Sequence, residues 1–450
     1  MQGLARNVDK GPPNPSKAVA LGFAVAILVG AFVLMLPIST TESGGASFRV
    51  AVFTSTSAVC VTGLAVVDTA TYWTPFGQAI IMALIQIGGL GIMTGASLLF
   101  LAVSRRVGLR NRMIAQQERG SINLGDVRRV LLGVIAFSIL AEIVIAVILS
   151  LRFWARDDIG FGVAVWRGAF HAVSAFNNAG FALFSANMMD YALDPIIIIT
   201  IALAVVMGGV GFPVWIELQR RWRKADRWSL HTKLTLVTTG VLLLGGWILL
   251  TALEWNNPAT LGPMSVPGKV LSGFFASVVP RTAGFNSIDY GEMGHPGIMI
   301  TDMLMFAGGG SGSTAGGIKV TTFAVLFIAA FAEFRGAPEV SSFGRRISSS
   351  IQRQSLTIAF AAMNAVVIGA LLIMVLSPFG FTESIFESIS AFGTVGLSMN
   401  VTPQLSGPAD AVLIALMYFG RVGPLTLAVA LLLRRHPRRF SYPEERPLVG

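Results

Sequence analysis

The 450-residue chain contains one cysteine, Cys60, and four histidines that are scattered along its length. It therefore has no second cysteine for an intramolecular disulfide and no Cys/His cluster with the spacing of a metal site. Paired carboxylates and a nucleophile beside its base are also missing at suitable spacing, which argues against a membrane-embedded enzyme. The sequence gives no reason to expect catalysis or an organic cofactor on this chain.

Charged residues are scarce as well. They make up 12% of the chain, against about a quarter of a typical soluble protein, while 54% of the residues are hydrophobic. Apolar stretches long enough to cross ~30 Å of hydrocarbon recur along the sequence. We therefore predict an all-α polytopic membrane protein with eight transmembrane helices, near 18–36, 76–103, 129–151, 195–218, 232–253, 296–331, 354–376 and 409–433.

The net charge of +10 is distributed unevenly. Lys and Arg concentrate in the two tails and in the loops after the second, fourth and sixth spans, whereas the alternate loops carry carboxylates such as Asp157 and Asp190. This is the positive-inside pattern, so we predict a multi-pass protein of the cell membrane with both termini cytoplasmic. Topology explains the basic charge, and nucleic acid is not needed as a partner.

A fourfold internal repeat organises the chain. Four segments align without a gap, and each has a glycine ten positions after its first Phe: FTSTSAVCVTGL (53–64), FHAVSAFNNAGF (170–181), FFASVVPRTAGF (274–285) and FESISAFGTVGL (386–397). A second signature follows each of them: IGGLG (87–91), MGGVG (207–211), GGGSG (308–312) and FGRVG (419–423). We assign four pseudo-repeats, at 18–105, 128–224, 230–335 and 353–435, with cytoplasmic tails at 1–17 and 436–450.

Each repeat reads as a span, a short apolar helix, a glycine-bearing loop and a second span. The short helix is too short to cross the bilayer, so it must enter and return on the same side. Non-helical backbone at membrane depth survives only where it is buried in protein or lines a water-filled cavity. We therefore expect the four loops to surround one central ion pore.

The loops contain glycine but no carboxylate, so a ring of side-chain charges is not available to coordinate a cation. Backbone carbonyls are the alternative ligands, glycine tolerates the dihedral angles that turn them inward, and the negative ends of four short helices would favour a cation. The predicted K+ filter consists of Cys60, Val61, Thr62, Gly63, Asn177, Asn178, Ala179, Gly180, Arg281, Thr282, Ala283, Gly284, Gly393, Thr394, Val395 and Gly396.

The glycine-rich stretch 307–322 superficially matches a phosphate-binding loop. That motif needs Lys directly after its second glycine and then Ser or Thr, but Ile318 separates Gly317 from Lys319 and Val320 follows. The stretch also interrupts an apolar span instead of joining a soluble strand to a helix. A nucleotide site is therefore a poor explanation.

The segments SAVCVTGL, FNNAGF, PRTAGFNS and FGTVGL, with the glycine-interrupted sixth span, resemble the Trk/Ktr/HKT superfamily of potassium transporters, and within it the KtrB-type membrane subunits. The resemblance implies that Gly63, Gly180, Gly284 and Gly396 mark the filter, and that glycine in place of serine at the first of them favours K+ over Na+. It also implies a homodimer in the lipid bilayer, on a separate cytosolic ring of RCK-type (KtrA-like) subunits that bind ATP, ADP or NAD. The basic loops 104–128 and 333–353 are candidate docking segments.

The resemblance further implies an intramembrane gate loop at 307–319, below the filter. Glycine costs ~1 kcal/mol each against alanine in a helix, so this stretch cannot hold a stable one; a kink that merely packs is the alternative. Arg421, which stands where the other repeats have Gly89, Gly209 and Gly310, is implied as an electrostatic barrier, unless it pairs with Glu383 or Glu387. The predicted gate comprises Gly308, Gly309, Gly310, Ser311, Gly312, Ser313, Thr314, Ala315, Gly316, Gly317, Lys319 and Arg421.

Several other polar residues have two possible roles. Lys319 either anchors the gate loop or snorkels to the cytoplasmic side, and Arg281 is expected to point away from a cation path. We expect Glu142 to make a polar contact with a neighbouring helix, with ion binding as the alternative, and His171 to pack, with a ligand role as the alternative. Carboxylates just after two filters, Asp68 and Asp289, either concentrate cations at the mouth or are solvated surface charges.

Two other transport functions compete with potassium uptake. A secondary transporter for an organic solute should show inverted halves and midplane polar groups, which four parallel filter-like segments do not resemble. A sodium-coupled or sodium-selective transporter of the same superfamily is the closer alternative.

Overall fold

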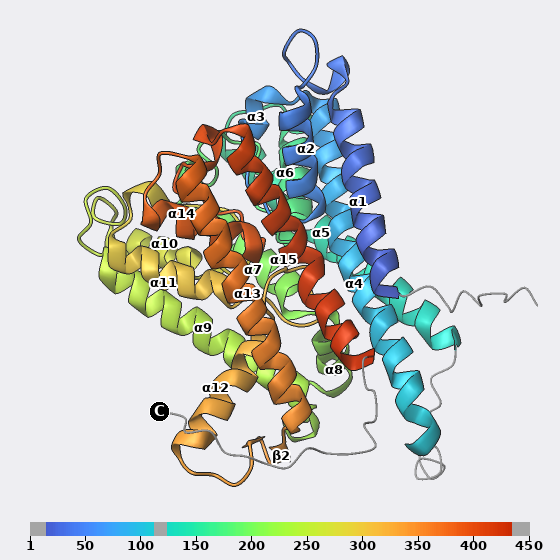
Figure 1. The fold of residues 1–450 in the computed structure, drawn as a ribbon. Coiled ribbons are helices and arrows are strands. Elements are labelled where there is room, and N and C mark those ends of the chain that lie inside the picture. The colour runs from blue at the N-terminus through green and yellow to red at the C-terminus, as the bar shows by residue number, and fades with distance from the viewer. Residues whose placement is uncertain (1–14, 112–123, 434–450) are drawn as a thin grey trace, which may run out of the picture.

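A computed structural model describes residues 15–111 and 124–433, and their side chains over 18–94, 131–424 and 426. Long helices lie side by side and shorter helices sit between them (Figure 1). Strands within these ranges are limited to the hairpin of β1 (Ser341–Ser342) and β2 (Arg345–Arg346). The α-helices are α1 (Pro15–Leu34), α2 (Phe48–Val59), α3 (Thr69–Tyr72), α4 (Pro75–Asn111), α5 (Leu124–Arg156), α6 (Phe161–Phe176), α7 (Pro195–Val210), α8 (Phe212–Arg221), α9 (Leu230–Glu254), α10 (Val266–Val278), α11 (His295–Phe306), α12 (Val320–Phe334), α13 (Ser349–Leu376), α14 (Phe381–Gly393) and α15 (Gly407–Leu433).

The same arrangement occurs four times along the chain. A long helix leads to a short helix, then to a loop, then to a helix that returns beside the first: α1–α2–α4, α5–α6–α7, α9–α10–α11 and α13–α14–α15. The short helices have 12, 16, 13 and 13 residues, and each packs against the long helix that precedes it. The protein is an all-α polytopic membrane protein.

The predicted spans all contain helix, but they differ in continuity. Judged by length and composition over the described residues, four helical stretches can each cross a membrane alone, at Pro75–Thr94, Leu131–Arg156, Leu230–Glu254 and Ser349–Leu376. A fifth candidate consists of α7 and α8 taken together. The count of eight spans therefore remains a prediction from the sequence.

The fourth predicted span, 195–218, is wrong as a continuous helix. α7 and α8 meet at 96°, and the break is at Gly211, whose φ is +101°. A side chain resists this conformation, and Pro213 at the start of α8 has no N–H to continue the α7 ladder. The N–H of Phe212 instead donates to the carbonyl of Gly312, at 3.2 Å.

The sixth predicted span, 296–331, is broken where its glycines predict. α11 ends at Phe306 and α12 begins at Val320, and the thirteen residues between them form neither helix nor extended sheet, apart from one isolated bridge between Ala307 and Ile318. The predicted loop 307–319 thus matches the observed break.

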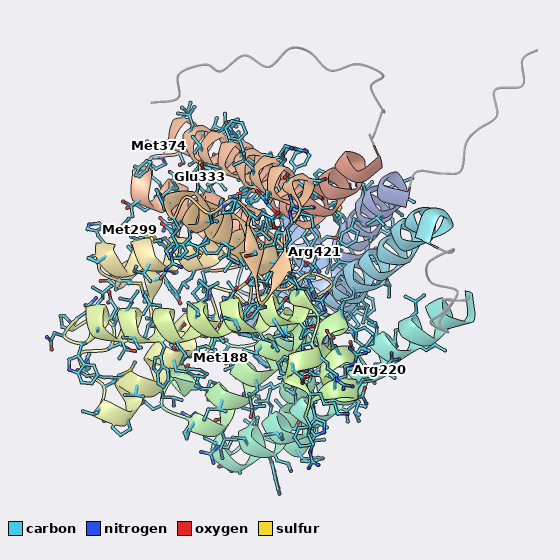
Figure 2. All side chains as sticks on the ribbon, turned by 90° about the horizontal axis from the view of Figure 1, so that it is seen from below. Met188, Arg220, Met299, Glu333, Met374 and Arg421 are labelled. Atoms are coloured by element: carbon cyan, nitrogen blue, oxygen red, sulfur yellow. The ribbon has the colours of Figure 1, made fainter. Side chains whose placement is uncertain are left out.

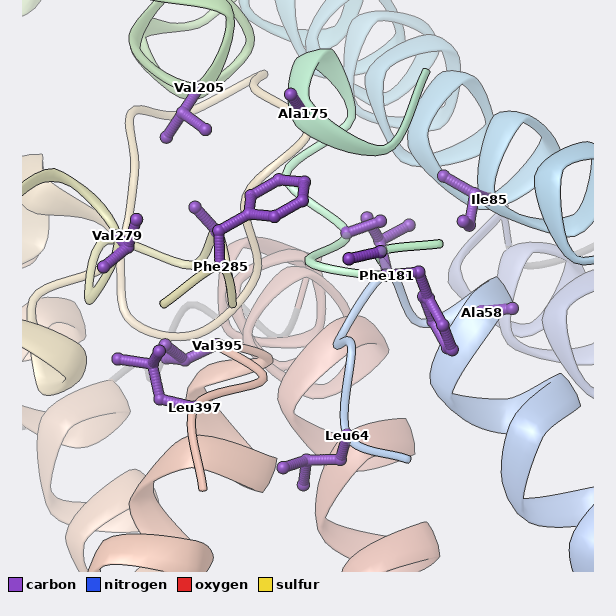
Figure 3. Packing of buried hydrophobic residues seen from close by; sticks show 14 of the residues in the cluster. Ala58, Leu64, Ile85, Ala175, Phe181, Val205, Val279, Phe285, Val395 and Leu397 are labelled. Carbon is purple, nitrogen blue, oxygen red and sulfur yellow. The ribbon is translucent and has the colours of Figure 1, made fainter. Parts of the chain in front are cut away.

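The centre of the molecule is apolar and closely packed. Leu64, Phe181, Phe285 and Leu397 each follow a repeat glycine, and each is at most 2% exposed. Figure 3 shows that they come from four separate segments around one central region. In contrast, large apolar side chains of α13 such as Val375 are exposed, as expected for helices that face lipid.

Some expectations fall outside the described residues. The predicted tails 1–17 and 436–450 do so, apart from the helical backbone of residues 15–17. The side chains of the basic loop 104–128 do so as well. The other predicted docking loop, 333–353, contains the β1–β2 hairpin, where Arg346 and Glu339 form an exposed ion pair of 2.9 Å.

Candidate ion filter and gate

The four repeat glycines lie in a closed ring. A Cβ atom built on Gly63 would lie 2.4 Å from the carbonyl oxygen of Ala179, and one on Gly180 would lie 2.8 Å from that of Ala283. A Cβ on Gly284 would lie 2.7 Å from the carbonyl oxygen of Val395, and one on Gly396 would lie 2.1 Å from that of Thr62. Each repeat therefore touches the next, and the fourth touches the first. These distances leave no room for a side chain at any of the four positions.

The backbone of all four loops follows one pattern. The fourth residue of each loop is its glycine, with φ between +70° and +97°. The second residue also has positive φ, although it is not glycine: Val61 (56°), Asn178 (61°), Thr282 (66°) and Thr394 (51°). Left-handed β-branched residues are rare, and such strain clusters at functional sites. Left-handed residues at alternate positions reorient successive peptide groups, which is what a filter built from carbonyls needs.

Side chains of the short helices support these strained loops. Ser57 and Ser390, at equivalent positions, accept hydrogen bonds from the N–H groups of Gly63 (3.0 Å) and Gly396 (3.1 Å). Residues one turn earlier hold the segment that follows the loop. There, His171 accepts from the N–H of Leu183 at 3.2 Å, and Glu387 accepts from that of Met399 at 3.2 Å.

These supports were not predicted from the sequence. His171 was expected to pack, and its ring does stack on Phe184, with centroids 4.8 Å apart. Its hydrogen bond to Leu183 is an additional role. The signal was present, because His171 and Glu387 both follow the first Phe of an aligned segment, but the other two repeats have Thr54 and Phe275 there.

The second repeat signature allows close packing beneath the loops. A Cβ on Gly88, Gly208 or Gly420 would lie 1.8–2.0 Å from the carbonyl oxygen of the last or next-to-last residue of the short helix in its repeat. The long return helices therefore touch the ends of the short helices directly.

The loop 307–319 lies beside these return helices and is largely buried. Its N–H groups donate across repeats, from Gly310 to the carbonyl of Gly209 (2.8 Å) and from Gly317 to that of Gly420 (3.2 Å). The hydroxyl of Thr314 donates to the side chain of Asn178, the strained residue of the second filter loop, at 2.8 Å. The loop is thus attached directly to the ring.

Two cations hold this loop. Arg421 donates to the carbonyl of Thr314 and, at 3.0 Å, to that of Gly88. It is 3% exposed and forms no ion pair with Glu383 or Glu387 within the described part of the chain. Lys319 donates to the carbonyls of Ala315 (2.5 Å) and Gly316 (3.4 Å). In the view from below, Arg421 lies inside the bundle, whereas Met299 and Arg220 lie toward its periphery (Figure 2).

The two other charged candidates, Arg281 and Glu142, contact neighbouring helices. Arg281 reaches away from its loop to the hydroxyl of Thr239 on α9, at 3.2 Å. Glu142 contacts a neighbouring helix, as expected, through Gln86 of α4, but it also contacts Asn177 of the second filter loop. Among the described residues, no group of three or more His, Cys, Asp or Glu side chains could hold a metal ion.

The outer rim is closed by contacts between neighbouring repeats. Asp68 accepts from Ser185 (2.5 Å), and Asp289 accepts from Asn400 (3.0 Å). The N–H of Met188 donates to the carbonyl of Asn286 (3.1 Å), and Arg49 pairs with Asp410. Asp68 and Asp289 are therefore more than solvated charges, because each joins two repeats.

The chain is similar to known cation transporters over nearly its whole length. The TrkH family model, described as a cation transport protein, matches residues 21–441. The Ktr system potassium uptake protein B of Bacillus subtilis (strain 168) is 41% identical over 439 residues, 97% of each chain. The protein of the same description from Vibrio alginolyticus is 39% identical over 98% of this chain and 96% of its own.

Two further similarities bear on ion type and on fold. The potassium/sodium uptake protein NtpJ of Enterococcus hirae is 37% identical, over 97% of both chains. The crystal structure of the potassium transporter TrkH from Vibrio parahaemolyticus superimposes with a TM-score of 0.71, covering 96% of this chain and 88% of that one at 17% sequence identity. This structural match supports the fold.

Proposed function

The chain belongs to the TrkH family of cation transport proteins, and on that premise we propose that it carries potassium into the cell through the ring of four filter loops. The observation that carries the proposal is the closed contact of Gly63, Gly180, Gly284 and Gly396 with the carbonyls of the next repeat. Carbonyl oxygens that converge on one axis can replace the hydration shell of K+. The relatives named for potassium uptake support the choice of ion.

The loop 307–319 is the gate in this proposal. It is buried beside the ring, and it is attached to the second repeat through Gly209 and Asn178 and to the fourth repeat through Gly420 and Arg421. The N–H groups of Gly310, Thr314 and Gly317 bond to other repeats, and that of Gly308 bonds to Ile318 within the loop. Because none of these bonds belongs to a helix, the loop can detach as a unit without unfolding a span. Arg421 adds a positive charge below the filter, which opposes cation passage while the loop is seated.

Regulation and assembly complete the proposal. We assign the chain to a homodimer with both termini in the cytoplasm, on a cytosolic RCK-type ring that binds ATP, ADP or NAD. The support is the charge pattern of the sequence and the relatives named as Ktr system proteins. The test is co-purification of the chain with such a ring. The ring should no longer co-purify when the docking segments 104–128 and 333–353 are replaced.

A sodium-dependent or sodium-permeable version is the second candidate. It is favoured by one observation, the 37% identity to a protein named for potassium and sodium uptake. Against it, glycine occupies all four ring positions. Uptake of radioactive rubidium by cells that lack their own potassium uptake systems separates the two. Potassium uptake predicts saturable rubidium entry that K+ inhibits and excess Na+ does not, and equal inhibition by Na+ would favour the second candidate.

A further inference from the structure

A buried carboxylate of α5 is tied to the second filter loop. Glu142 is 7% exposed. One of its oxygens accepts from Nε2 of Gln86 on α4, at 3.0 Å, and the other accepts from Nδ2 of Asn177, also at 3.0 Å. Asn177 also donates to Oε1 of Gln86, at 2.8 Å. The three side chains thus form a closed cluster that joins two repeats to the filter.

Asn177 is a sensitive point to hold. It directly follows α6 and precedes Asn178, whose φ of +61° belongs to the strained filter pattern. Its side-chain nitrogen is surrounded by three acceptors, in Gln86, Glu142 and the carbonyl of Val173 at 2.9 Å. With only two hydrogens on that nitrogen, its orientation is tightly fixed.

The carboxyl group of Glu142 has no cationic partner in the described part of the chain. None of the ion pairs found among the described residues involves it. Both of its oxygens accept hydrogen bonds, and such bonds favour the ionised form of a carboxyl group. An unpaired carboxylate at membrane depth is costly and is usually functional. The nearest use for a negative charge beside a cation filter is to offset the charge of the ion in it.

We propose that Glu142 is a positioning residue that acts on the filter in two ways: it fixes Asn177, and its negative charge stabilises a cation in the ring. The inference rests on the proposed function, because it needs a cation to occupy the ring. A unit charge about 10 Å from a monovalent ion, at an effective dielectric constant of about 20, changes cation affinity by roughly tenfold. A purely structural role would change stability without changing ion affinity.

The variants Glu142→Gln and Glu142→Asp separate charge from shape. The first removes the charge and nearly keeps the volume, and the second keeps the charge with a shorter side chain. Gln86→Leu keeps the carboxylate but removes its other hydrogen-bond partner. The matched control is Glu254→Gln, because Glu254 is also a buried carboxylate (2% exposed) but bonds to Asn257, Thr260 and Gly294 at the far end of α9.

Each full-length protein is purified in detergent, and its thermal unfolding midpoint is followed while KCl replaces choline chloride. The K+ midpoint is the K+ concentration that gives half of the maximal stabilisation. We expect it to be about tenfold higher in Glu142→Gln than in the wild type. In Glu142→Asp and Gln86→Leu it should rise clearly less than in Glu142→Gln. Glu254→Gln should have the wild-type K+ midpoint. In cells, Glu142→Gln should raise the KM for rubidium more than it lowers the maximal rate.

Three results would overturn the inference. First, the K+ midpoint of Glu142→Gln could equal that of the wild type. Second, the K+ midpoint of Gln86→Leu could rise as much as that of Glu142→Gln, which would leave only the hydrogen bonds as the cause. If Glu142→Gln does not fold, Glu142→Asp must retain a K+ midpoint near the wild type, and a tenfold loss there would equally contradict a role of charge. A wild type that K+ does not stabilise more than choline would instead contradict the proposed function.

Discussion

The guanidinium of Arg421 donates a hydrogen bond to the main-chain carbonyl of Thr314, in the middle of the proposed gate loop 307–319. These residues lie 107 positions apart in the sequence and belong to different repeats. A second nitrogen of the same guanidinium donates to Gly88 of the first repeat. One side chain thus links the gate loop to the return helices of the first and fourth repeats.

Replacing Arg421 should release the gate. The change Arg421→Gln removes the charge and at least one of the two donated hydrogen bonds, each worth about 1.5–3 kcal/mol when charged. We expect a severalfold higher basal rubidium flux into proteoliposomes that contain no regulatory subunit. The exposed Arg353 of α13 provides the control, and Arg353→Gln should leave the flux unchanged. An Arg421→Gln flux at or below the wild-type level would refute this role.

Shortening the gate loop should have the same direction of effect. Deletion of Gly310 to Ala315 removes Thr314 and with it the bonds to Arg421 and Asn178. Because α11 and α12 end on either side of the deleted segment, the helices themselves are not cut. Basal rubidium flux should rise above that of Arg421→Gln. Unchanged flux in a folded protein would favour a kink that merely packs.

The ring should not accept a side chain at position 63. In Gly63→Ser the new Cβ would lie 2.4 Å from the oxygen of Ala179, at a φ of +97°. The left-handed conformation alone costs roughly 1–2 kcal/mol, which corresponds to about a tenfold change in an equilibrium constant. We expect rubidium uptake to fall by at least that factor and Na+ to compete better with K+.

A control for this change is available in the same chain. Gly240 lies in α9, and a Cβ there meets nothing within 4 Å. Gly240→Ser should therefore transport normally, with wild-type discrimination between K+ and Na+. If Gly63→Ser and Gly240→Ser behave alike, the ring does not select the ion.

Asp194 predicts a pH dependence of stability. Burial by itself raises the pKa of this carboxyl, but hydrogen bonds from Arg152 and from the N–H of Ile197 outweigh it, so the pKa lies below its ordinary value of 3.8. A group with a lowered pKa stabilises the fold above its unfolded pKa, and this contribution is lost as the pH falls through the folded value. The wild type should unfold at a higher temperature than Asp194→Asn at pH 5–7, and the difference should shrink below about pH 4. A difference that is constant with pH would contradict the assignment.

The residues that form the ring could be predicted because the sequence itself repeats four times. The glycines at 63, 180, 284 and 396 align without gaps, and only glycine meets the close approach that the structure shows there. The break in the sixth span was predictable for a similar reason, since consecutive glycines weaken a helix.

The break in the fourth span was not predictable in this way. MGGVG (207–211) looks like IGGLG (87–91), yet α4 continues through its copy and α7 stops at Gly211. The difference arises from Pro213 and from the bond between Phe212 and Gly312, a residue from another repeat. Pro213 is a local signal, but the partner Gly312 is distant in the sequence, so the sequence alone does not fix the break.

The left-handed second residues of the loops and the Glu142 cluster were hidden for the same reason. Nothing in the side chains of Val61 or Thr282 favours positive φ, so the surrounding packing must impose it. Glu142, Gln86 and Asn177 come from three separate segments, and only the fold brings them together.

The most direct test of the account is a crystal structure of the protein grown in rubidium, with anomalous scattering recorded at the rubidium edge. Carbonyl coordination predicts an anomalous peak on the axis of the ring, among the oxygens of Thr62, Ala179, Ala283 and Val395, which excess K+ weakens by competition and an equal excess of Na+ does not. A ring without a peak, or a rubidium ion bound only by side chains elsewhere, would contradict the central claim.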